Sequence, residues 1–241
     1  MLRHLGKKRE FKHDLGLATF LAFSAGFVNA AGFVAFGLLT TNVTGHAATL
    51  AIDLVSRDWH AAARILLWLM LFLAGSFVSG LFIGAVGVDK RYAYVGPVWG
   101  VILCLGIVCL FASPDASLHQ KHAFTGILLF AMGMQNAVVT VISGSVVRTT
   151  HLTGIFTDLG VDLARIVGEG QSRILWSRTL LRISIITAFL SGGISGAFGF
   201  HRLSFISFLL PIAILLLTLL YSRLRIGLKR TKIRIAKPGR R

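Results

Sequence analysis

Long apolar runs separated by short polar stretches recur along almost the whole chain. Each run is roughly 20 residues long, which is the length of helix that crosses the hydrocarbon core of a bilayer. The runs predict six membrane-spanning helices, at Leu15–Gly37, Ala61–Val88, Tyr92–Ala112, His122–Val141, Ser177–Phe200 and Leu203–Tyr221. We therefore expect an all-α fold, a polytopic membrane helical bundle.

Three short motifs occur twice, in the same order. NVTGHAATLAIDL begins at Asn42, and HLTGIFTDLGVDL begins 109 positions later at His151. GFVNA precedes the first copy and matches GMQNA 107 positions on, while SFVSG at residues 76–80 matches GGISG at 192–196. Such ordered recurrence predicts two structural repeats. The expected organisation is a basic N-terminus (1–14), repeat 1 (15–112), a connecting loop (113–121), repeat 2 (122–222) and a basic C-terminal tail (223–241).

Each repeat carries a short polar segment between its first two spans, at about 41–56 and 150–167. Carboxylates are costly at the bilayer centre, so these segments are expected to be re-entrant rather than spanning. Each repeat then crosses three times, and the second is inverted relative to the first. This six-crossing scheme puts 21 Lys/Arg on the cytoplasmic side and 4 outside. An eight-crossing scheme, in which both polar segments span, gives the same division, so charge leaves both schemes open.

Composition and charge agree with a membrane protein. The chain is 55% hydrophobic and 14% charged, whereas soluble domains have about 25% charged residues. The net charge of +16 comes chiefly from the two ends, including nine Lys/Arg and no acid after Tyr221. The positive-inside rule predicts that both termini are cytoplasmic. Anionic lipid is the partner expected for the tails, and nucleic acid is not expected.

The repeated motifs also predict a central site. Thr-Gly before an apolar-periodic stretch is typical of a helix start, and two such starts entering from opposite faces would aim their positive ends at one centre. Secondary transporters built from inverted repeats hold their solute in this way. The candidate solute-binding residues are Asn29, Thr44, Gly45, Gln135, Asn136, Thr153 and Gly154. The three amides are equally typical of simple bridges between helices.

Three carboxylates in the polar segments are candidates for coupling or for ion pairs. Asp53 precedes Arg57 by four residues and Asp162 precedes Arg165 by three, the spacings of ion pairs on a helix surface. Asp158 and Asp162 share one helix face, as a proton relay would require.

Other chemistry is weakly indicated. His46 and His151 each stand without a ligand cluster, and the two cysteines lie within one apolar run, so neither a metal site nor a cofactor is expected. Hydrolase and nucleotide-binding motifs are absent from the sequence, which argues against an enzyme. Two G-x-x-x-G runs, Gly80–Gly84 and Gly192–Gly196, predict close helix packing. We expect a small-solute transporter or permeation protein; a non-transporting membrane scaffold or regulator is the alternative.

The chain resembles the YoaK-like family of bacterial multi-pass membrane proteins, which carries the label domain of unknown function 1275. The resemblance covers roughly residues 15–222 and is carried by GFVNAAGFVAFG, NVTGHAATLAIDL, DW, AMGMQNAVV and VRTTHLTGIFTDLGVDLAR. Family members commonly have an acidic residue where Asn29 stands and an Asn where His46 stands. The resemblance implies a multi-pass protein of the bacterial inner membrane and names no substrate.

Overall fold

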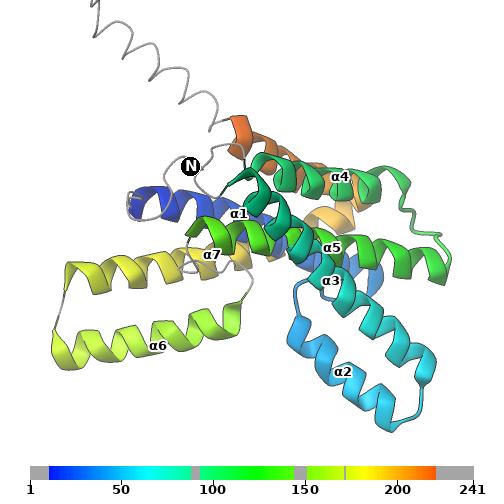
Figure 1. Ribbon diagram of the computed structural model, residues 1–241, viewed down its shortest axis with the longest axis horizontal. Coiled ribbons are helices and arrows are strands. Elements are labelled where there is room, and N and C mark those ends of the chain that lie inside the picture. The colour runs from blue at the N-terminus through cyan, green and yellow to red at the C-terminus, as the bar shows by residue number, and fades with distance from the viewer. Residues whose placement is uncertain (1–10, 88–92, 144–150, 171, 221–241) are drawn as a thin grey trace, which may run out of the picture.

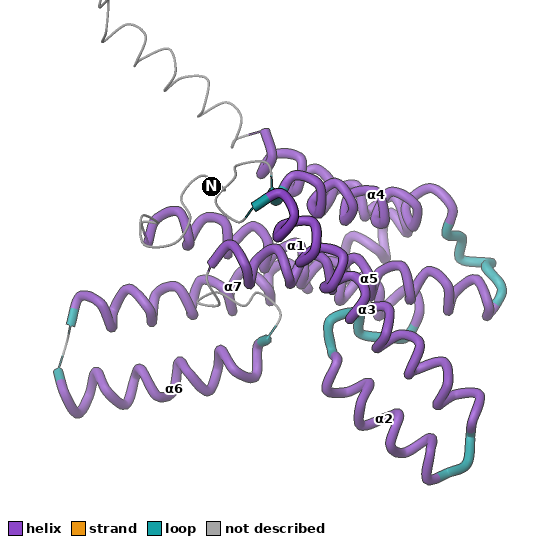
Figure 2. Tube along the Cα trace, viewed as in Figure 1, coloured by secondary structure: helices purple, strands orange, loops and turns teal. Residues whose placement is uncertain are grey.

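The described part of the chain consists of helices joined by short loops, without a strand (Figures 1 and 2). The structure is a computed structural model that describes residues 11–87, 93–143, 151–170 and 172–220. The helices are α1 (Phe11–Phe36), α2 (Val43–Val55), α3 (Trp59–Val86), α4 (Val95–Phe111), α5 (Leu118–Ser143), α6 (Leu152–Glu169) and α7 (Arg173–Leu203). A 3-10 segment, η2 (Ser204–Phe208), follows α7 and leads into a helix at residues 209–220. The basic termini (1–10 and 221–241) and Arg148 lie outside the described residues.

The all-helical class is confirmed, with helices at all six expected positions. Four stretches are long and apolar enough to cross a membrane, namely Ala18–Phe36, Trp59–Val86, Leu118–Val141 and Arg173–Leu220. The last combines two expected spans, because α7 continues through η2 into the helix at 209–220. The span expected at 92–112 is α4, whose 17 residues lie at the short end of the range for a transmembrane helix.

Two helical hairpins project from the centre of the molecule in different directions. In the first arm α2 packs on the beginning of α3, and in the second arm α6 packs on the beginning of α7 (Figure 1). Side-chain N-caps stabilise the first turns of α3 and α7. Asp58 accepts a hydrogen bond from the amide of Ala61, and Ser172 accepts one from the amide of Leu175. The arms therefore place the starts of α2 and α6 near the centre and their ends at the two tips.

The core is built on two very close helix crossings. α1 packs along α7, and α3 packs along α5. A Cβ atom added at Gly26 would collide with the carbonyl oxygen of Phe189, and one at Gly192 with that of Phe23. Backbones can approach this closely because glycine has no side chain, which is how membrane helices maximise van der Waals contact.

The second crossing uses the same arrangement. A Cβ at Gly133 would collide with the carbonyl oxygen of Phe72, and one at Gly75 with that of Phe130. Each of the four helices thus contributes the sequence Phe-x-x-Gly to its crossing.

The two G-x-x-x-G runs behave differently. Gly192 and Gly196 lie against the backbone of α1, at Phe23 and Phe27, as expected. A Cβ at Gly80 or Gly84 would meet open space, so the prediction of close packing at the first run is wrong within this chain. The close contact of this helix is five residues earlier, at Gly75.

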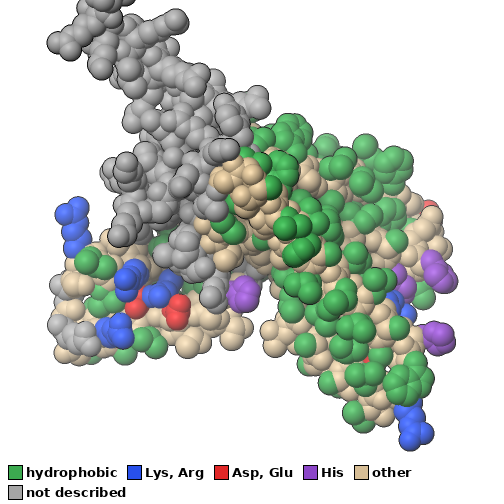
Figure 3. Space-filling model, viewed as in Figure 1, with side chains coloured by type: hydrophobic (Ala, Val, Ile, Leu, Met, Phe, Trp, Pro, Cys, Tyr) green, Lys and Arg blue, Asp and Glu red, His purple; other side chains and the backbone are tan. Residues whose placement is uncertain are grey.

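Apolar side chains cover much of the surface outside these crossings (Figure 3). Large exposed hydrophobic residues on α3 include Leu67, Leu73, Phe77 and Leu81. Such a surface is unfavourable in water and is typical of helices that face lipid.

Candidate functional site

A cavity of about 260 Å³ lies where the starts of α2 and α6 meet α1, α3, α5 and α7. Its walls combine amides and hydroxyls with two phenyl rings, and the described lining contains no carboxylate, Lys or Arg. The lining residues are Asn29, Leu39, Thr41, Asn42, Val43, Thr44, Phe72, Asn136, His151, Leu152, Thr153 and Phe189.

Four of the seven candidate solute-binding residues line this cavity. Asn29 comes from α1 and Asn136 from α5, while Thr44 and Thr153 stand in the first turns of α2 and α6. Residues far apart in the sequence, from both copies of the repeated motif, are thus brought to one place.

The two motif glycines stand one residue further along their helices and do not line the cavity. A Cβ at Gly45 would collide with the side chain of Asn42, which accepts a hydrogen bond from the Gly45 amide. Gly45 therefore provides room for the helix cap. Gly154 has open space at its Cβ position.

Gln135 lies away from the cavity, in the contact between α5 and α1. Its side chain is buried, and its Nε2 donates a hydrogen bond to the carbonyl oxygen of Leu21 at 3.0 Å. In this structure Gln135 takes the bridging role that is typical of buried amides in membrane helices.

The segment between α1 and α2 is non-helical and is held by side chains. The Thr41 amide donates to Oδ1 of Asn29 at 3.0 Å, and the His46 Nε2 atom lies 2.8 Å from the Leu39 carbonyl oxygen. Irregular backbone at membrane depth is tolerated where it is buried in protein or lines a cavity and its polar groups have partners. Asn29 and His46 supply two of those partners, so both shape the cavity wall.

Both short helices point their N-termini at the cavity, since Asn42–Thr44 and His151–Thr153 line it. Figure 1 shows α2 and α6 leading away from this point toward the two tips. The first N–H groups of a helix have no intrahelical partner and give that end a partial positive charge. At α2 the Asn42 side chain caps these groups, whereas the His151 side chain makes no such hydrogen bond at α6.

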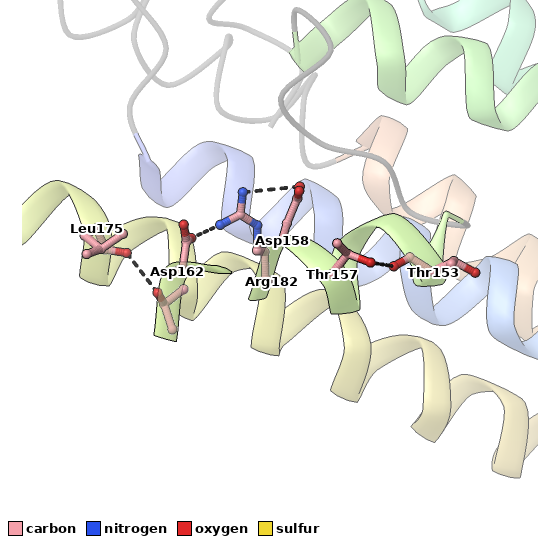
Figure 4. Close-up of polar contacts among 7 residues, drawn as sticks. Thr153, Thr157, Asp158, Asp162, Leu175 and Arg182 are labelled. Atoms are coloured by element: carbon pink, nitrogen blue, oxygen red, sulfur yellow. Dashed lines mark hydrogen bonds and ion pairs between the residues drawn. The ribbon is translucent and has the colours of Figure 1, made fainter. Parts of the chain in front are cut away.

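The carboxylates of α6 share one arginine from α7 (Figure 4). Arg182 forms an ion pair with the buried Asp162, and its second terminal nitrogen lies 3.3 Å from Oδ2 of the exposed Asp158. The prediction that Asp162 pairs with Arg165 is therefore wrong, because the packing of α6 on α7 brings Arg182 to Asp162 instead. The face shared by Asp158 and Asp162 is the one that meets α7.

The expected pair between Asp53 and Arg57 is also not formed. Arg57 lies beyond the end of α2 with a φ of 60°, and among the described residues no ion pair joins it to Asp53. The i, i+4 geometry requires both residues to be helical, and the helix ends at Val55.

His46 packs among aromatic groups. Its ring centroid lies 6.2 Å from that of Trp68, whose indole nitrogen donates to the His122 carbonyl oxygen. The described residues contain no group of three or more His, Cys, Asp or Glu side chains able to hold a metal ion.

Sequence reasoning did not select eight of the twelve described lining residues as candidate solute-binding residues, and it also missed Arg182. Phe72 and Phe189 line the cavity, and they lie 117 positions apart in the two copies of Phe-x-x-Gly on α3 and α7. A search for internal repeats at that offset would have found them. Arg182 lies inside a long apolar run, where an arginine is itself a sign of a buried partner.

Comparison with known proteins identifies the family to which the chain belongs. No curated protein and no solved structure matches the chain significantly. The family model described as a protein of unknown function (DUF1275) matches residues 17–221. The match covers most of the chain, including all the described residues that line the cavity. The protein therefore belongs to the DUF1275 family, as its repeated motifs suggested.

Proposed function

We propose that the chain moves a small polar solute across the bacterial inner membrane through the central cavity, which lies between two inverted repeats. The observation that carries this proposal is the make-up of the cavity wall. Ten of its twelve described residues form five pairs related by the internal repeat. The pairs are Asn29 with Asn136 (107 positions), Asn42, Val43 and Thr44 with His151, Leu152 and Thr153 (109), and Phe72 with Phe189 (117).

The helix crossings support the same repeat. The contact of Gly26 with Phe189 corresponds to that of Gly133 with Phe72 when the offsets of 107 and 117 are applied. This alignment pairs Gly75 with Gly192, one register away from the sequence match of residues 76–80 with 192–196. An axis relating the halves would pass through the cavity, which is where transporters with inverted repeats bind solute.

Helix directions support the inversion. Gly192 and Gly196 contact Phe23 and Phe27 in that order, so α1 and α7 run in the same direction. Because α5 runs opposite to α7 across the bundle, α1 and α5 are antiparallel (Figure 1). α2 and α6 start at the central cavity, which favours six crossings over eight. Six crossings place both basic termini in the cytoplasm.

The lining indicates the class of solute. Amides and hydroxyls offer hydrogen bonds, the two phenylalanine rings offer apolar contact, and no carboxylate, Lys or Arg of the described lining offers a full counter-charge. The volume of about 260 Å³ lies just below the roughly 300–1,000 Å³ of sites that take drug-sized ligands. A polar molecule of a few heavy atoms fits this description.

Permeation into proteoliposomes tests the proposal. The purified protein is reconstituted and challenged with gradients of glycerol, urea, glycine and alanine, and vesicle swelling is followed by light scattering. We expect faster swelling with at least one solute, and loss of that effect when Thr153→Phe fills the cavity. Gly80→Ala is the matched control, because its Cβ points into open space. A scaffold would give the swelling rate of protein-free vesicles with every solute.

A further inference from the structure

We propose that Arg182 is the positioning residue for one half of the cavity: by holding Asp158 and Asp162, it fixes α6 on α7 and thereby sets where His151, Leu152 and Thr153 stand. The inference rests on the proposed site and adds to it a difference between the two halves.

The first observation is how little else holds α6. Among the described helices, α7 is the one on which α6 packs extensively. Ile155 and Asp162 are buried among the α6 side chains that the structure describes, and Leu152 and Leu159 are partly buried against the core. Other large apolar side chains of the helix, such as Phe156, are exposed. An aspartate is thus one of the few side chains that hold this helix in place.

The second observation is the geometry of the anchor. The Asp162 side chain is 6% exposed and that of Arg182 is 23% exposed, so little solvent competes with the ion pair. A charge left alone in such a place is costly, which makes the two groups depend on each other. Asp162 lies nine residues after Thr153, about 13.5 Å along the helix. The buried ion pair is therefore about two and a half turns from the cavity wall, and Asp158 lies between the two.

The third observation is that α2 is held by other chemistry. The repeat offsets align Asp162 with Asp53 and Arg182 with Ile65, so the first half has no arginine at the corresponding place. The one buried residue of α2 is His46, whose Nε2 atom reaches the Leu39 carbonyl oxygen and whose ring packs near Trp68. Loss of Arg182 should consequently release α6 and leave α2 in place.

The experiment measures helix positions and needs no knowledge of the solute. In a full-length Cys104→Ala/Cys109→Ala background, nitroxide labels are placed at Leu103 on α4 and at Val161 on α6, and a second sample carries labels at Leu103 and Ile52 on α2. All three label positions are exposed. Distance distributions are recorded by pulsed electron paramagnetic resonance on protein in lipid nanodiscs.

We expect Arg182→Ala to shift or broaden the distance from 103 to 161 by about 5 Å, one helical turn, and to leave the distance from 103 to 52 unchanged. Arg182→Lys, which keeps a charge for Asp162, should restore most of the original distribution. His46→Leu should give the reverse pattern. The double variant Asp158→Asn/Asp162→Asn should repeat the effect of Arg182→Ala and serves in its place if that variant does not fold.

An unchanged distance from 103 to 161, or equal changes in both distances, would overturn the assignment of Arg182. A protein that shows the selective pattern yet transports no solute would refute the proposed function and leave the role of Arg182 standing.

Discussion

Gly26 of α1 lies directly against the carbonyl oxygen of Phe189 in α7, at a distance that leaves no room for a Cβ atom. The corresponding contact joins Gly133 of α5 to Phe72 of α3. Phe72 and Phe189 also line the cavity, so the same residues close the helix bundle and shape the candidate site. Packing and function are therefore expected to respond together when these contacts change.

Substituting the crossing glycines should destabilise the protein. Gly26→Ala and Gly133→Ala each push a methyl group into a backbone carbonyl that cannot move alone, and overpacking of this kind costs about 1–3 kcal/mol. The measurement is the thermal unfolding midpoint in detergent, followed by intrinsic fluorescence. Gly84→Ala, with open space at its Cβ, is the control and should unfold like the parent. Equal midpoints for all three variants would mean that the close crossings are not present in the folded protein.

Asn29 should tolerate aspartate better than leucine. Its Oδ1 accepts the Thr41 amide hydrogen bond, and a carboxylate oxygen can accept the same bond. Leucine removes this part-buried hydrogen bond, at a cost of about 0.5–1.5 kcal/mol. The unfolding midpoints of Asn29→Asp and Asn29→Leu test the difference. A larger loss with Asp than with Leu would contradict the prediction and show that a carboxylate charge at this position costs more than the retained hydrogen bond contributes.

The two motif glycines should separate stability from solute passage. Gly45→Ala displaces the Asn42 cap of α2, and loss of such a cap costs about 0.5–2 kcal/mol. Gly154→Ala meets open space and should leave the unfolding midpoint unchanged. Gly154→Leu places a larger side chain beside the uncapped start of α6, and we expect it to slow solute entry in the vesicle assay without unfolding the protein. Identical stability of Gly45→Ala and the parent would show that the Asn42 cap contributes little.

The tips of the arms should lie at opposite faces of the membrane. Trp59 and Trp176 lie in the first turns of α3 and α7, are 117 positions apart and are both exposed. Exposed tryptophans are typical of the membrane–water interface. In the Cys104→Ala/Cys109→Ala background, Trp59→Cys should react with a membrane-impermeant maleimide on intact cells. Trp176→Cys should react in inside-out vesicles. Reaction of both cysteines from one side would refute the inverted arrangement and favour eight crossings.

The sequence alone determined the helical class, the positions of the apolar helices and the presence of two related motifs. These properties are local, since run length, polarity and repetition can be read from neighbouring residues. It also pointed to four residues that the structure brings to one cavity, Asn29, Thr44, Asn136 and Thr153, because each belongs to a motif that occurs twice.

Tertiary structure decided which residues meet. Spacing along α6 suggested Arg165 as the partner of Asp162, but the packing of α6 on α7 places Arg182 next to Asp162 instead. Likewise G-x-x-x-G suggested Gly80 as a contact, and the crossing of α3 with α5 uses Gly75. A difference of five residues in the place where two helices cross leaves the sequence pattern of both helices unchanged, yet it changes which residues meet at the contact. The partners of Asp162 and the walls of the cavity therefore depend on helix crossings, which no local pattern specifies.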